Sequence, residues 1–111
     1  MIVRMWQAQA TAANAEAYER FVTTQVFTRL PEIDGHRGAY LLKRPISDQV
    51  EYVVVTLWDS ADAIRTFAGD VIDRAVVEPG ARAVLSSFDD TVRHFELAYG
   101  TVPHRRIGDR P

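Results

Sequence analysis

The segment from Val50 to Trp58 constrains the fold more than any other, because it is apolar on both of its faces. Its β-branched and aromatic residues are typical of a β-strand. Successive side chains of a strand point to opposite faces, which gives two apolar sets: Val53, Val55 and Leu57 on one face, and Tyr52, Val54 and Trp58 on the other. A sheet with helices on one side and water on the other would alternate apolar and polar residues. The segment therefore predicts a sheet that is covered on both faces.

The rest of the chain supplies further strands and two helices. Strands are predicted at residues 2–9, 39–44 and about 91–98, and helices at about 12–30 and from 61 onward. The first helix has Thr11 or Asn14 as its cap and ends at Pro31; the second is capped by Ser60. Their buried stripes are, respectively, Tyr18, Phe21, Val22, Val26 and Leu30, and Ile64, Phe67, Ala68 and Val71. The order strand, helix, strand, strand, helix, strand predicts a ferredoxin-like α+β fold, with one antiparallel sheet and both helices on one face.

Because the two helices can cover only one face of this sheet, the other face needs a partner. The predicted strand at residues 2–9 is also apolar on both faces, with Val3 and Met5 on one face and Ile2 and Trp6 on the other. Burying a large apolar side chain contributes about 1.5 to 3 kcal/mol, so several such residues can hold two copies together. We therefore predict a homodimer.

Length and composition define the class of protein. A chain of 111 residues has room for one core, predicted at residues 1–99, followed by a tail at 100–111. It has no cysteine and a net charge of −2, which exclude disulfides and give no field that attracts nucleic acid. The predicted strand at residues 50–58 also lacks the basic aromatic pattern of RNA-recognition domains. The first residues are too soon polar for a signal peptide or membrane span, so we expect no membrane association and a cytoplasmic protein.

Several stretches resemble the antibiotic biosynthesis monooxygenase family. The main one is Val55-Thr56-Leu57-Trp58-Asp59-Ser60-Ala61-Asp62-Ala63-Ile64, a third strand that ends in Trp before a Ser-capped helix; residues 33–42, 67–70 and 92–96 resemble the family too. The resemblance covers about residues 1–99. It implies a dimeric α/β barrel with a pocket between sheet and helices in each subunit.

The resemblance also implies two activities. Some members of this superfamily oxidise polycyclic phenols with dioxygen and no cofactor, so that the protein supplies deprotonation, orientation and a dry pocket. Others bind and cleave haem with an Asn on strand one, the strand-three Trp and a His after it. Only Trp58 of that haem set is present, and residues 69–76 contain no histidine, which argues against haem cleavage. The pocket Asn of the phenol-oxidising members is missing as well, since Asn14 is the only asparagine.

Eight residues are candidates for the site. Catalytic roles fall to Trp58, His94 and Arg93, and substrate-binding roles to Trp6, Phe27, Tyr40, Tyr52 and Phe67. Trp58 could orient a flat substrate or simply pack in the core. His94 could act as a base with Glu96 on the same strand face and Arg93 on the opposite one, or be a satisfied interface histidine. We interpret His36, between two glycines, as part of a turn.

No metal or cofactor is predicted. The carboxylate pairs Asp89-Asp90 and Asp70/Asp73 have no neighbouring His ligands in the sequence, and hydrolase and nucleotide-binding motifs are missing. The first hypothesis is a cofactor-independent monooxygenase-like enzyme for a hydrophobic aromatic or quinone-like molecule. The alternatives are a non-catalytic dimeric module that binds an aromatic metabolite, and a structural dimer without a ligand.

Overall fold

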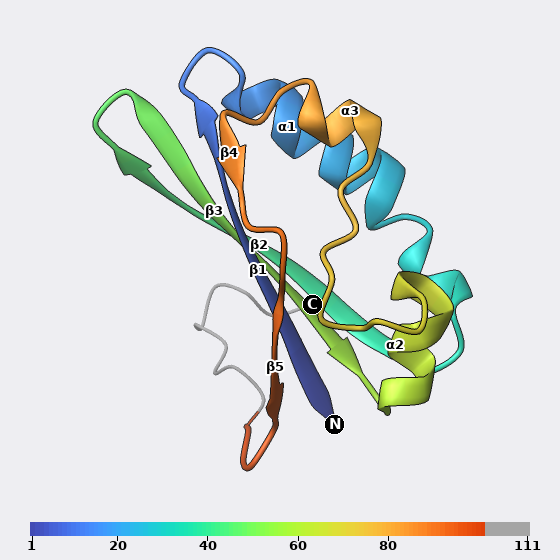
Figure 1. The fold of residues 1–111 in the computed structure, drawn as a ribbon. Helices are drawn as coiled ribbons and strands as arrows, with labels where there is room; N and C mark the ends of the chain where they lie inside the picture. The colour runs from blue at the N-terminus through green and yellow to red at the C-terminus, as the bar shows by residue number, and fades with distance from the viewer. Residues whose placement is uncertain (102–111) are drawn as a thin grey trace, which may run out of the picture.

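The computed structural model describes residues 1–101 and shows a single antiparallel sheet with helices on one of its faces (Figure 1). The strands are β1 (Ile2–Thr11), β2 (His36–Ile46), β3 (Gln49–Trp58), β4 (Ser87–Phe88) and β5 (Arg93–Glu96). The helices are α1 (Ala15–Phe21), the π-helical turn η1 (Val22–Val26), the 3-10 turn η2 (Leu30–Glu32), α2 (Ala61–Ala68) and α3 (Pro79–Arg82). Strands lie in the order β2, β3, β1, with β4 and β5 both paired to β1. The predicted ferredoxin-like α+β fold is confirmed.

The last strand differs from the prediction of one strand at about 91–98. The chain instead pairs twice with β1, through β4 beside Ala8 and Gln9 and through β5 beside residues 2–5. Between them residues 89–92 belong to neither strand: the Asp89 N–H still donates to the Gln7 carbonyl at 3.0 Å, and the Trp6 indole N–H donates to the Asp89 carbonyl at 2.6 Å. The indole thereby satisfies a backbone acceptor where regular pairing is interrupted.

The first helix is shorter than the predicted span 12–30 because it changes type. After α1 the backbone widens to the π turn η1, in which the Phe27 N–H donates to the Val22 carbonyl at 2.9 Å. Here the hydroxyls of Thr23 and Thr24 donate to carbonyls four residues earlier, at 2.8 and 2.6 Å. Such side-chain bonds compete with helical geometry, and π turns occur frequently at functional sites. Asn14 occupies the N-cap position without a side-chain bond.

The second helix begins as predicted and ends one turn early. Ser60 caps it by accepting the Ala63 N–H at 3.2 Å. Gly69, at φ +84°, ends it after Ala68, so Val71 does not belong to the helical stripe and is 59% exposed. The prediction for Val71 is therefore wrong, because the glycine turns the chain before that residue.

The edge strand β2 is longer than predicted at both ends. It starts at His36, with a bulge before Gly38, and runs through Pro45 to Ile46. Proline is tolerated there because an edge strand has unpaired N–H positions. His36 is therefore part of the strand and packs edge-on against Trp58, with ring centroids 5.0 Å apart; its interpretation as a turn residue is wrong.

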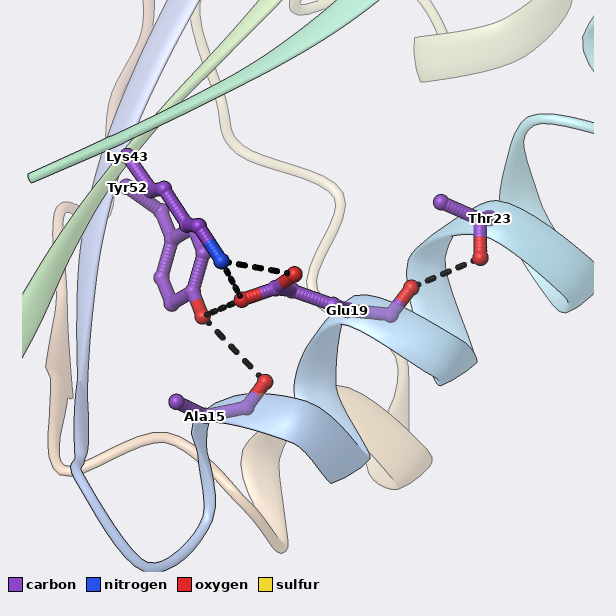
Figure 2. Close-up of polar contacts among 5 residues, drawn as sticks. All are labelled: Ala15, Glu19, Thr23, Lys43 and Tyr52. Atoms are coloured by element: carbon purple, nitrogen blue, oxygen red, sulfur yellow. Dashed lines mark hydrogen bonds and ion pairs between the residues drawn. The ribbon is translucent and has the colours of Figure 1, made fainter.

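A polar cluster fastens α1 to the sheet (Figure 2). The fully buried Tyr52 of β3 donates its hydroxyl to the Glu19 carboxylate at 2.6 Å, and Lys43 of β2 reaches the same carboxylate at 3.0 Å. The Tyr52 hydrogen bond is the largest of the effects that lower the pKa of Glu19, ahead of Lys43. The carboxylate is thus held ionised between helix and sheet.

The sheet face opposite the helices carries the apolar set that the sequence predicts. Val3, Met5, Val53, Val55 and Leu57 are only partly buried there, and Tyr40, Leu42 and Phe95 are 56, 50 and 45% exposed. These eight residues are called the open sheet face below.

Two further observations concern the remaining expectations. None of the helices within residues 1–101 is long and apolar enough to cross a membrane. The predicted tail falls almost entirely on residues 102–111, which lie outside the described part of the chain.

Candidate functional site

An apolar cavity lies between the sheet and the helices. Its walls come from β1, α1, η1, β3 and α2 and from the segment after α2, with lining residues that include Trp6, Phe21, Phe27, Val54, Phe67 and Val76. The cavity has a volume of about 70 Å³ and opens to solvent on one side. Since an apolar cavity of about 150 Å³ encloses benzene, a single aromatic ring would fill this one and extend into its opening.

One cation borders this apolar cavity. Arg4 of β1 lines it and is only 4% exposed. Within residues 1–101 no carboxylate lies within ion-pair distance of its guanidinium. Burial lowers the pKa of Arg4 to about 10, an effect that Asp73 partly opposes. The side chain is therefore still charged at neutral pH, and no carboxylate within residues 1–101 contacts it directly.

Arg4 is held by backbone carbonyls of the segment after α2. Its Nη1 donates to the Ile72 carbonyl at 2.5 Å and its Nη2 to the Arg74 carbonyl at 3.1 Å. A guanidinium has five N–H donors, and no acceptor among residues 1–101 takes the Nε–H. Donor capacity therefore remains on a cation at the cavity wall.

His94 completes a chain of contacts behind Arg4. Its Nε2 lies 3.0 Å from Arg4 Nη1, and its Nδ1 lies 3.1 Å from Asp73 Oδ1. Arginine can only donate, so Nε2 accepts and the Nδ1–H donates to the carboxylate. Burial, and then the charge of Arg4, lower the pKa of His94. The neutral imidazole therefore links Asp73 to Arg4, whereas the sequence placed Glu96 beside it.

Trp58 lies in the core beneath α2 and is not among the residues that line the cavity. It is fully buried, and its indole N–H donates to Thr56 Oγ1 at 2.8 Å. Its ring stacks on Phe67 at a centroid distance of 5.8 Å, and Phe67 does line the cavity. Trp58 therefore supports the cavity wall indirectly, by packing against Phe67.

The other candidate residues divide into two groups. Trp6, Phe27 and Phe67 come together around the cavity. Tyr52 is next to it, packed against the cavity-lining Tyr18 at 4.8 Å, with its hydroxyl used by Glu19. The structure places the remaining two elsewhere: Tyr40 on the open sheet face, and Arg93 exposed on β5 beside the Phe95 ring.

Sequence reasoning missed Arg4 and Asp73. Arg4 had a readable signal, because it alternates with Ile2 and Trp6 and so shares the helix-facing side of β1. Asp73 had none, since only the folded chain brings it to His94, 21 positions away. Tyr18 was identified as core but not as cavity wall; burial raises its pKa and keeps the phenol neutral.

Within the described residues, no group of three or more His, Asp or Glu side chains is arranged to hold a metal ion. Among the described lining residues, those with polar side-chain atoms besides Arg4 are Thr56, Tyr18 and Trp6. The wall is therefore suited to an apolar ring that carries an oxygen.

Comparison with solved structures identifies proteins of the same fold. A Bacillus cereus protein classed as an antibiotic biosynthesis monooxygenase superposes with a TM-score of 0.66 at 12% identity, over 95% of this chain and 98% of the other. SnoaB from Streptomyces nogalater, a cofactor-independent oxygenase, gives 0.62 as a single-residue variant at 21% identity, over 93 and 97%. MhuD from Mycobacterium tuberculosis, as a variant with two manganese protoporphyrin IX molecules per active site, gives 0.65 at 20% identity, over 93 and 100%.

Sequence comparison gives no match: no family profile and no curated protein sequence is similar enough. The likeness is therefore one of architecture, and it spans nearly the whole of both chains. It agrees with the resemblance noted at residues 55–64. The chain has the fold of the antibiotic biosynthesis monooxygenase proteins.

Proposed function

We propose that this protein is a cofactor-independent monooxygenase-like enzyme that binds a hydrophobic aromatic or quinone-like molecule in the cavity between the sheet and the helices. The observation that carries the proposal is the cavity itself, which is apolar, lined by Trp6, Phe27 and Phe67, and bordered by the buried cation of Arg4. Dry apolar walls with few polar groups are the usual form of a small-molecule site. SnoaB, of the same fold, is a cofactor-independent oxygenase.

Binding and turnover can be tested separately. Trp6 lines the cavity, so an anthrone-type phenol that enters should quench tryptophan fluorescence saturably, and Trp6→Phe should remove most of that signal. Dioxygen uptake with the same phenols then measures turnover. Quenching with uptake supports the enzyme. Quenching without uptake for every phenol would support the alternative function, a non-catalytic binding module. That alternative is favoured by the described cavity wall, which contains no carboxylate or histidine. No quenching would contradict both.

A porphyrin does not fit this site. None of the described residues that line the cavity is a histidine, the usual protein ligand of haem iron. His94 already accepts from Arg4 at Nε2, and His36 is packed beneath Trp58. The MhuD ligand therefore gives no guide to the ligand of this chain.

The same proposal includes a homodimer formed through the open sheet face. A monomer would leave Tyr40, Leu42 and Phe95 about half exposed on a continuous sheet, and exposed apolar patches of this kind mark interaction sites. A second copy offers an equally apolar face of the same shape, as a two-fold dimer requires. The occupant is therefore another copy of this chain.

The test is oligomeric mass by light scattering after size exclusion. Leu42→Asp places a charge on the open sheet face of each copy. It also removes the burial of a half-exposed leucine, which contributes about 1 kcal/mol per copy to the stability of the dimer. We expect the variant to be monomeric. Thr24→Asp, exposed on η1, is the control and should stay dimeric. A monomeric wild type would contradict the proposal.

A further inference from the structure

We infer that Arg4 makes the cavity selective for ligands in anionic form, so that the substrate is an aromatic phenol or enol bound as its oxyanion. This inference rests on the proposed function, because it concerns the same cavity. It goes further by assigning the residue that selects the charge state of the substrate. Arg4 was not among the candidate residues of the sequence.

The first argument is the unbalanced charge. A buried cation normally has an ionic partner, yet Arg4 donates within residues 1–101 only to two backbone carbonyls and an imidazole nitrogen. These neutral acceptors hold the guanidinium in place but do not neutralise it. An anion in the cavity would supply the missing partner in a medium of low polarity, where the attraction is strong.

The second argument is the identity of the groups around the cation. Asp73 does not contact Arg4, because His94 lies between the two side chains and is hydrogen-bonded to both. The remaining described cavity wall is aromatic or aliphatic except for Thr56 and Tyr18, and Thr56 Oγ1 already accepts the Trp58 indole N–H. Within residues 1–101 no carboxylate lines the cavity wall, and the charge of Asp73 reaches Arg4 only from behind His94.

The third argument is shape. Phe67 lies beside the guanidinium, 5.9 Å from its carbon to the ring centroid. An aromatic ligand next to Phe67 would therefore bring a ring oxygen toward Arg4 while its ring stays among apolar side chains. A nearby cation lowers the pKa of a bound phenol, typically by about one to three units, and the proton that the phenol releases passes to solvent at the open side of the cavity.

His94 and Asp73 act as positioning residues in this arrangement. The Asp73 carboxylate accepts the Nδ1–H of His94, which leaves Nε2 as an acceptor for Arg4. The guanidinium is thereby fixed from the side away from the cavity. Loss of that acceptor would let Arg4 move, and the effect on a bound phenol would weaken.

The experiment uses 4-nitrophenol, a single-ring probe of a size suited to the cavity, whose phenolate absorbs at longer wavelength than the phenol. Protein is added at a pH below the probe's free pKa. We expect the phenolate band to grow, with the bound pKa lowered by at least one unit, a tenfold preference for the anion. The methyl ether, 4-nitroanisole, should bind without this preference and more weakly.

Matched variants locate the effect. Arg4→Met should abolish the pKa shift while 4-nitroanisole still binds, and Arg4→Lys should retain part of the shift. Arg93→Met, which removes an exposed arginine from the other sheet face, should leave it unchanged. His94→Leu should reduce the shift and His94→Gln, which keeps an acceptor, should restore it; an unchanged shift in His94→Leu would overturn the positioning role.

The outcomes separate this inference from the proposed function. If the wild type binds 4-nitroanisole as tightly as 4-nitrophenol and no phenolate band grows, anion selection is wrong while the aromatic site stands. If neither compound binds, the aromatic site itself fails. Should Arg4→Met not fold, the wild-type comparison of the two probes and Arg4→Lys still decide the matter.

Discussion

The contact between Gly35 and α2 allows a sharp test of how the cavity wall is built. Gly35 has φ +90°, and a Cβ added there would lie 2.6 Å from the Ala63 Cβ. Gly69 has a similar φ of +84°, but a Cβ added there meets nothing within 4 Å. The two glycines therefore separate backbone strain from steric overlap. Gly35 matters to the site because α2 carries Phe67, which lines the cavity.

The magnitudes follow from that geometry. Gly69→Ala should cost about 1 to 3 kcal/mol, the range for strained positive φ. Gly35→Ala should cost about 1 to 3 kcal/mol more, because overpacking against a fixed helix adds that amount. Ala63→Gly in the Gly35→Ala background removes the overlapping methyl group and should recover part of the loss, less about 1 kcal/mol of helix propensity.

The assay is urea unfolding followed by far-UV circular dichroism, at one protein concentration for all variants because a dimer's stability depends on it. The reasoning predicts that Gly35→Ala is clearly the more destabilised single variant. Equal losses for Gly35→Ala and Gly69→Ala, or losses of Gly35→Ala and Ala63→Gly that simply add in the double variant, would refute it.

Three other predictions follow from buried groups. Burial lowers the pKa values of His36 and His94; below about pH 6.5 the unfolded chain therefore binds protons that the native chain does not, and the free energy of unfolding should fall from pH 7 toward 5 in urea titrations, less steeply in His94→Gln. A pH-independent stability over that range would contradict this. Tyr52→Phe should cost about 1.5 kcal/mol and raise the pKa of Glu19 in an NMR titration, because the hydrogen bond that most lowers this pKa is lost; an unchanged pKa would argue against it. Trp58→Phe should cost about 2 kcal/mol through lost volume and an unpaired hydroxyl yet keep 4-nitrophenol binding; loss of binding in a folded variant would show direct contact with the ligand.

The strand β3 was predictable because its side chains from Tyr52 to Trp58 are apolar on both faces. Thr56 is the one exception. Alternation alone then assigns Val55 and Leu57 to the open sheet face and Trp58 to the helix-facing side, as the structure shows. The Ser60 cap was predictable because it depends only on neighbouring residues: the Ser60 hydroxyl accepts the Ala63 N–H three positions later. Local rules work where the interaction is local.

The errors arose where local and distant contacts compete. The helical period of residues 12–30 does not reveal the π turn, because the threonine hydroxyls compete with the backbone for the same carbonyls. In the second helix, Gly69-Asp70 was recognised as a break, but the apolar period still placed Val71 in the buried stripe beyond it. In the last strand, the interruption coincides with a contact between distant residues, the hydrogen bond from Trp6 to Asp89, 83 positions away.

The site was predictable in its aromatic part and not in its charged part. Trp6, Phe27 and Phe67 follow from large apolar side chains on elements that face each other. Arg4 was overlooked because a charged residue in an apolar strand is usually assigned to solvent. Its burial follows from the fold, in which the carbonyls of Ile72 and Arg74, about 70 positions away, accept hydrogen bonds from its guanidinium N–H groups.

A crystal structure of the protein with 4-nitrophenolate bound tests the central claim most directly. The account predicts the ring in the cavity beside Phe27 and Phe67, with the phenolate oxygen about 2.7 to 2.9 Å from a guanidinium nitrogen of Arg4. A ring bound in the cavity with its oxygen turned to solvent, or a probe bound only on the open sheet face, would contradict it.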